Sequence, residues 1–115
     1  MNPSPVFELS ACDMIEVPSV AFTKCKYLRK TILDLSQNRL RDLGPNIDAL
    51  ACLEELDLSK NNFKSLQPDI SKLKNLRVLK LSGNLKFDDV SSILSLVLLE
   101  ELHIDGTSIK ATQCH

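Results

Sequence analysis

Leu33-Asp34-Leu35-Ser36-Gln37-Asn38-Arg39-Leu40 is the stretch that decides the fold, because it returns along the chain. The second copy is Leu56-Asp57-Leu58-Ser59-Lys60-Asn61-Asn62-Phe63, and the third is Leu79-Lys80-Leu81-Ser82-Gly83-Asn84. The Asn residues at 38, 61 and 84 are 23 residues apart each time. A fourth copy, from Leu102 to Ile109, keeps the step but has Thr107 in place of Asn. Repetition at this period predicts a stacked solenoid, in which each unit buries its apolar face against its neighbours.

The repeated phrase resembles the leucine-rich repeat family, whose pattern is L-x-x-L-x-L-x-x-N/C-x-L. Residues 53–63 fit it in full, and residues 99–109 fit apart from the Thr. The copy that begins at Leu76 fits until Lys86 falls on the last apolar position, and we expect Phe87 to fill that position by a local slip. Two weaker copies come earlier, one with Lys30 at the first Leu position and one that opens at Phe7. The resemblance therefore covers nearly the whole chain.

The resemblance implies an α/β fold, a leucine-rich repeat solenoid in a short right-handed horseshoe arc. It would have about five repeats, with parallel strands on the concave side and short helical or irregular segments on the convex side. The residues agree, because Leu56-x-Leu58 has the spacing that sends both side chains to one face of a strand. Pro45 and Pro68 interrupt any long amphipathic helix.

We predict a single domain over residues 1–115. Residues 1–30 would form a degenerate N-terminal repeat and a capping helix, for which Ser19 to Leu28 is the best helical candidate. Residues 31–99 would form the regular repeats, and residues 100–115 a truncated last repeat and tail.

The recurring Asn is interpreted as a structural ladder rather than as a binding feature. A tight turn after each strand leaves backbone groups inside the coil, and an Asn side chain can both donate to and accept from them. Cys12 takes this position in the first repeat, where we expect it to be buried. The ladder residues are Cys12, Asn38, Asn61, Asn84 and Thr107.

Charge and hydropathy narrow the classes of partner. The 115 residues include 14 basic and 15 acidic ones, a balance that argues against a dedicated nucleic-acid binder. No apolar run approaches the roughly 20 residues that span a bilayer. The first residues, Met1 to Pro5, lack the basic and apolar regions of a signal peptide.

The cysteines favour a cytoplasmic, reducing location. Cys12, Cys25, Cys52 and Cys114 are scattered without a C-x-x-C pair, so four free thiols are the simplest interpretation. Cys114-His115 could supply at most a fragment of a metal site, and we expect neither a metal nor a cofactor.

Function is expected at the outward positions of the strands, which line the concave face in this family. Seven of these positions are acidic and three are basic, so the face is acid-biased, while Val6, Ile32 and Val78 add apolar points. The bland alternative is that these charges only keep an exposed sheet soluble. The residues predicted to bind a protein partner are Glu8, Ile32, Asp34, Arg39, Glu55, Asp57, Lys60, Val78, Lys80, Glu101, His103 and Asp105.

Catalysis is not expected. His103 lies between Glu101 and Asp105 on alternate residues of one strand, but no nucleophile in a pocket accompanies it, and no Gly-rich phosphate loop occurs. A basic cluster of Lys24, Lys26, Arg29 and Lys30 could meet an acidic partner or anionic lipid, although such a cluster is more often a solvated face.

Two functions from different classes remain open. The pattern Leu66-x-Pro68-x-Ile70 looks like that of the Ras-suppressor and Scribble-like class of intracellular repeats, which implies an adaptor or scaffold in signalling. The alternative is a structural or assembly component. It would self-associate through an uncapped C-terminal edge formed by Leu102, Ile104 and Ile109.

Overall fold

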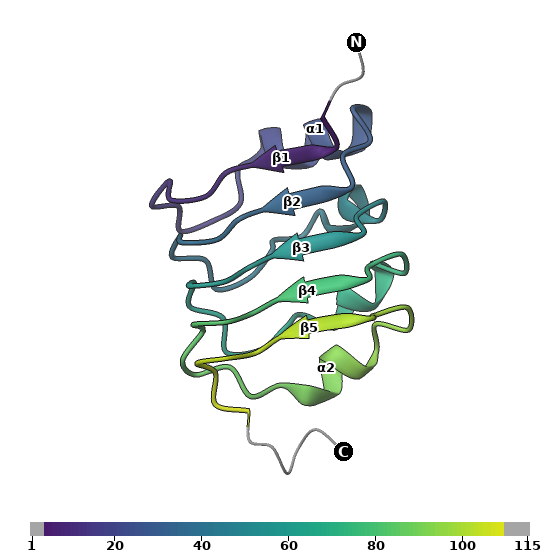
Figure 1. Cartoon of the computed structure of the whole chain (residues 1–115). Helices are drawn as coiled ribbons and strands as arrows, with labels where there is room; N and C mark the ends of the chain where they lie inside the picture. The colour runs from purple at the N-terminus through teal and green to yellow at the C-terminus, as the bar shows by residue number, and fades with distance from the viewer. Residues whose placement is uncertain (1–3, 110–115) are drawn as a thin grey trace.

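Five short strands form one all-parallel sheet in the computed structural model, which describes residues 4–109 (Figure 1). The sheet order is β1-β2-β3-β4-β5, so each strand pairs only with its neighbours in sequence. This topology confirms the predicted stack, in which the chain makes one turn of a coil per repeat. The strands are β1 (Val6–Glu8), β2 (Ile32–Asp34), β3 (Glu55–Asp57), β4 (Val78–Lys80) and β5 (Glu101–His103).

One short helical segment follows each of the first four strands, on the opposite side of the coil from the sheet (Figure 1). α1 is the longest, lies where the sequence predicts a helix, and packs against η1 as the first member of this convex row. Pro68 begins η2, a position where its missing N–H costs nothing. The segments are α1 (Ser19–Tyr27), η1 (Ile47–Leu50), η2 (Pro68–Lys72) and α2 (Val90–Leu94).

The hydrophobic core lies between the sheet and the convex row and is mostly aliphatic. The middle residues of three strands, Leu33, Leu56 and Leu79, are fully buried. Phe63 and Phe87 are the largest buried side chains, and each follows the turn that ends its strand. Since every coil places its side chains at equivalent positions, the core runs continuously through the stack.

The fourth coil contains the expected local slip. Phe87 is buried, while Lys86 is exposed and the Leu85 side chain is 74% exposed. The slip is corrected within the same coil, because Ile93 comes three positions after Val90, whereas Ile70 comes four positions after Leu66. Ile93 is buried, so the 23-residue phase is restored there.

The three ladder Asn side chains join each coil to the one before it. Asn61 Oδ1 accepts a hydrogen bond from Leu40 N (3.0 Å), and its Nδ2 donates to Leu35 O (2.9 Å) and Leu58 O (3.0 Å). Asn84 and Asn38 repeat this arrangement one coil later and one coil earlier. All three side chains are buried, so they satisfy backbone groups that water cannot reach.

The two substituted ladder positions behave differently. Cys12 is exposed, so the expectation that it would be buried is wrong. No coil precedes the first one in the described chain, and the Cys12 Sγ makes only a local bond to Ser10 O (3.3 Å). Thr107 Oγ1 donates to Ile104 O (2.7 Å) within its own coil. The Cys114-His115 pair lies outside the described residues.

Candidate functional site on the strand face

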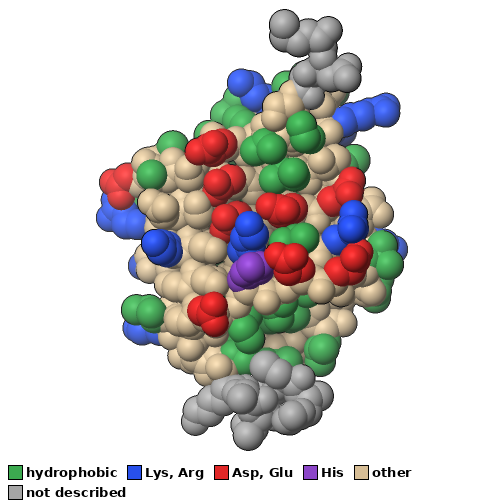
Figure 2. All heavy atoms as spheres, viewed as in Figure 1, with side chains coloured by type: hydrophobic (Ala, Val, Ile, Leu, Met, Phe, Trp, Pro, Cys, Tyr) green, Lys and Arg blue, Asp and Glu red, His purple; other side chains and the backbone are tan. Residues whose placement is uncertain are grey.

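The outward side of the sheet, here called the strand face, consists of two rows of side chains in register. Each strand contributes its first and third residues. The middle residues of β2, β3 and β4 are buried in the core, while Phe7 in β1 is half-buried and Leu102 in β5 is 36% exposed. The first row holds Val6, Ile32, Glu55, Val78 and Glu101. The second row holds Glu8, Asp34, Asp57, Lys80 and His103. Ten residues from five distant segments thus form one surface (Figure 2).

Three carboxylates stand side by side in the second row, and we call Glu8, Asp34 and Asp57 the acidic row. The parallel pairing places Glu8 beside Asp34 and Asp34 beside Asp57, so the strand spacing of about 4.8 Å separates neighbouring backbones. Like charges directly opposite one another destabilise a sheet. Among the described residues, no basic side chain forms an ion pair with any of the three.

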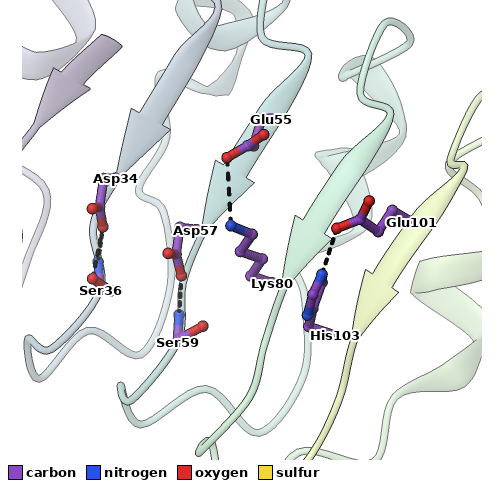
Figure 3. A network of polar contacts seen from close by, with 8 residues as sticks. All are labelled: Asp34, Ser36, Glu55, Asp57, Ser59, Lys80, Glu101 and His103. Carbon is purple, nitrogen blue, oxygen red and sulfur yellow. Dashed lines mark hydrogen bonds and ion pairs between the residues drawn. The ribbon is translucent and has the colours of Figure 1, made fainter.

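Local hydrogen bonds fix two of these carboxylates (Figure 3). Asp34 Oδ1 accepts from Ser36 N (3.0 Å) and Ser36 Oγ (2.7 Å), and Asp57 Oδ1 accepts from Ser59 N (3.0 Å). The repeated Asp-x-Ser sequence therefore both ends the strand and orients the carboxylate. Since Asp34 and Asp57 are only half-buried, they remain available to a partner.

Opposite charges meet over the last three strands. Lys80 Nζ lies 3.6 Å from Glu55 Oε2, and His103 Nε2 lies 2.6 Å from Glu101 Oε2 (Figure 3). The hydrogen bond with His103 lowers the pKa of Glu101. Among the described residues, the His103 imidazole is hydrogen-bonded to Glu101 and not to Asp105. The acid bias of the strand face is thus concentrated over β1 to β3.

Two basic residues predicted on this face lie outside the two rows. Arg39 follows β2 in the turn and makes two contacts to Asp13 of the first coil, at 2.8 and 3.0 Å. Lys60 adopts φ +57°, and it lines a hollow beyond the end of β3. Both residues lie outside the rows because they belong to the turn. Side chains that flank the ladder Asn do not alternate between the two sides of the sheet as they do in a strand. Asp105 likewise comes after β5, in a turn with Gly106.

Two sets of bonds between coils were not predicted from the sequence. Before the strands, Arg77 Nε lies 2.6 Å from Glu100 Oε2, and Arg77 Nη1 lies 3.5 Å from Glu54 Oε1. The hydrogen bond to Glu100, with the charges of both carboxylates, raises the pKa of Arg77. Residues 54, 77 and 100 are separated by the repeat period and alternate in charge, which was the available signal.

The second set lies on the convex side. Gln67 accepts from Leu43 N (2.8 Å) and donates to Gly44 O (2.8 Å), while Asp89 Oδ2 accepts from Leu66 N (3.1 Å) in the next coil. Burial opposes ionisation of Asp89, but hydrogen bonds from Ser92 and Leu66 outweigh it and lower the pKa of Asp89. Gln and Asp at these positions look unrelated in sequence, so no repeated letter indicated them.

The described thiols are unpaired. Cys12 and Cys52 are exposed, while Cys25 lies on the buried side of α1, in the core. Burial raises the pKa of Cys25 to about 11, with Lys30 acting in the opposite direction. The Cys25 thiol therefore remains protonated and unreactive near neutral pH.

A family model described as a leucine-rich repeat matches residues 51–109, which is slightly more than half of the 115 residues. The chain belongs to the leucine-rich repeat family. Leucine-rich repeat domains generally mediate protein–protein interactions. A search of curated proteins gave no match.

Two further properties concern the described part of this leucine-rich repeat chain. Its helices include none with the length and apolar character that a membrane crossing requires. Within residues 4–109, His, Cys, Asp and Glu side chains nowhere gather in threes in an arrangement that could hold a metal ion.

Proposed function

We propose that this leucine-rich repeat domain binds a basic segment of a protein partner through the strand face, and that it has no enzymatic role. The observation that carries the proposal is the acidic row, in which Glu8, Asp34 and Asp57 stand in register and form no ion pair among the described residues. Lys80 lies in register beside Asp57, but its Nζ lies close to Glu55 instead. Keeping three like charges together costs stability, and a partner that supplies Lys or Arg would remove that cost. Val6 and Ile32 lie beside the acidic row and offer apolar contacts next to the charges.

We further propose that the domain acts as an adaptor or scaffold in intracellular signalling, as the resemblance to the Ras-suppressor and Scribble-like class implies. The start of η2 at Pro68 supports this class, because the Pro is part of the repeated phrase that carries the resemblance. The unpaired thiols of Cys12, Cys25 and Cys52 are compatible with a reducing, cytoplasmic setting.

A triple substitution of the acidic row tests the proposal. Glu8→Gln, Asp34→Asn and Asp57→Asn remove the charges, while an Asn Oδ1 can still accept the bonds from Ser36 and Ser59. We expect the immobilised variant to recover at least about tenfold less of a partner from cell lysate than the unchanged chain does. Raising the salt concentration should weaken the same interaction, because exposed charges are screened.

The matched control removes three acids that lie off the strand face, by Glu16→Gln, Asp42→Asn and Asp88→Asn. All three are exposed, so the net charge changes equally. The control should retain the partner. Equal loss from both variants would show that bulk charge, and not the acidic row, determines binding, and full retention by the acidic-row variant would place the binding surface elsewhere.

One observation favours the alternative of self-association, through residues other than the predicted edge of Leu102, Ile104 and Ile109. Of that edge, Leu102 is 36% exposed, and Ile104 and Ile109 are half-buried. Three apolar side chains are exposed in the segment between β4 and β5, and we call them the apolar patch. They are Leu94 (74% exposed), Val97 (77%) and Leu98 (53%). One repeat earlier the same positions hold Ser71, Lys74 and Asn75, which stay exposed although another coil follows them. The apolar patch is therefore exposed because these positions of the coil face outward, and not because the stack ends nearby. We propose that a second copy of the chain covers it.

Light scattering over a dilution series tests this alternative. We expect the unchanged chain to associate at high concentration, and the variant Leu94→Ser, Val97→Lys, Leu98→Asn to remain monomeric, because it carries the residues of the preceding repeat. A monomer at every concentration for the unchanged chain would rule the alternative out.

A further inference from the structure

A basic hollow lies on the loop edge of the stack, beyond the carboxyl ends of β3 and β4. Its volume is about 780 Å³, and the basic residues that line it are Arg41, Lys60, Lys64 and Lys86. No acidic residue lines it. The hollow is thus opposite in charge to the acidic row, although the whole chain carries a formal charge of only −1. Figure 2 shows Lys and Arg side chains along this edge, beside the strands rather than on them.

The repeat and its slip together create the basic hollow. Arg41 and Lys64 are equivalent residues of successive coils, 23 positions apart, so stacking brings them to the same edge. The slip in the fourth coil buries Phe87 and leaves Lys86 exposed instead. Gly83 completes the wall, because a Cβ there would lie only 3.0 Å from Lys60 Cγ. A side chain at position 83 would therefore displace Lys60.

The charges of the basic hollow are not neutralised within the described chain. Arg39, Lys72 and Arg77 each form an ion pair with a carboxylate on a neighbouring coil. None of the four cations in the hollow has such a pair among residues 4–109. Four like charges around one hollow raise the local positive potential, and an anion bound between them would lower their mutual repulsion.

We propose that the basic hollow binds a multiply phosphorylated group. A phosphate presents a dense negative charge and several acceptor oxygens, which suit the Arg41 guanidinium as a bidentate donor and the Lys ammonium groups as point charges. Asn62 and Ser65, which also line the hollow, add neutral donors. The volume lies in the range of small-ligand sites, about 300–1,000 Å³. The phosphates would belong either to a soluble polyphosphate or to a lipid headgroup.

Two binding measurements distinguish these sources. Calorimetric titration with inositol hexakisphosphate tests the soluble group, and cosedimentation with phosphatidylcholine vesicles that contain phosphatidylinositol bisphosphate tests the headgroup. We expect saturable binding in at least one of them. Lys64→Gln with Lys86→Gln should weaken that binding at least about tenfold, since two of four charge-assisted contacts are lost. Amide resonances of residues 60–65 and 83–86 should shift on titration.

Lys72→Gln with Lys74→Gln is the matched control, because it removes the same charge from exposed positions in and just after η2, outside the basic hollow. It should change the affinity less than twofold, and thermal melting should show that both variants fold. Three outcomes would overturn the proposal: no saturable binding in either arm, equal weakening by both double variants, or tighter binding of a poly-glutamate peptide than of either phosphate probe. None of these outcomes bears on the acidic row, which lies on a different surface.

Discussion

Asn61→Ala should lower the free energy of unfolding by about 1–3 kcal/mol, because it leaves buried backbone groups without partners. Asn61 is 6% exposed and sits in the middle of the ladder. Its amide spans two coils, accepting from Leu40 N and donating to Leu35 O and Leu58 O. Alanine cannot replace any of these bonds, and the site is too enclosed for water to reach all three groups. The two coils should therefore loosen together.

The matched control for this prediction is the next residue. Asn62 is exposed, and its backbone N–H, which a substitution keeps, donates to Leu40 O (2.8 Å). Asn62→Ala should change stability by no more than about 0.5 kcal/mol, as is usual for surface positions. Urea denaturation followed by circular dichroism measures both variants. Equal midpoints for the two would mean that the ladder does not stabilise the stack.

The fold could be predicted because the same sequence pattern, and with it the same expected geometry, occurs several times along the chain. The Leu-x-Leu spacing placed the strands, and the constant step of the Asn set their register, so the two rows of the strand face followed from alternation alone. Which side chains pair on that face was harder to predict from the sequence than the rows themselves. The Glu55–Lys80 contact joins different rows of adjacent strands, and it depends on how far a long Lys side chain reaches.

The loops were harder to predict than the strands. Alternation ends where the turn begins, so Arg39 and Lys60 lie beyond the two rows, in the turns after β2 and β3. Cys12 was expected to be buried by analogy with the ladder Asn, but burial there depends on a neighbouring coil and not on the residue type. The basic hollow could not be predicted from the sequence, because it depends on where the Lys86 side chain lies once Phe87 fills the core position. That location is set by packing.

Phe87→Ala should lower the free energy of unfolding by about 3–5 kcal/mol, more than Asn61→Ala does. The Phe87 side chain is fully buried and fills the core position that strict periodicity assigns to Lys86. Its truncation removes a large apolar surface from the core and leaves a cavity between the fourth coil and its neighbours. The loss would be a large part of the 5–15 kcal/mol that typically stabilises a domain. Chemical denaturation measures this loss of free energy of unfolding. The dependence on denaturant concentration should have the same slope for the variant and the unchanged chain.

Leu85→Ala is the control for this prediction, because Leu85 is apolar and only two residues away but 74% exposed. It should leave the midpoint nearly unchanged. Should Phe87→Ala not fold, Phe87→Leu provides a smaller truncation that should still lower the midpoint clearly more than Leu85→Ala does. If instead Leu85→Ala proved the more damaging, Leu85 and not Phe87 would occupy the core. The slip would then run in the other direction, and Lys86 would no longer be expected to line the basic hollow.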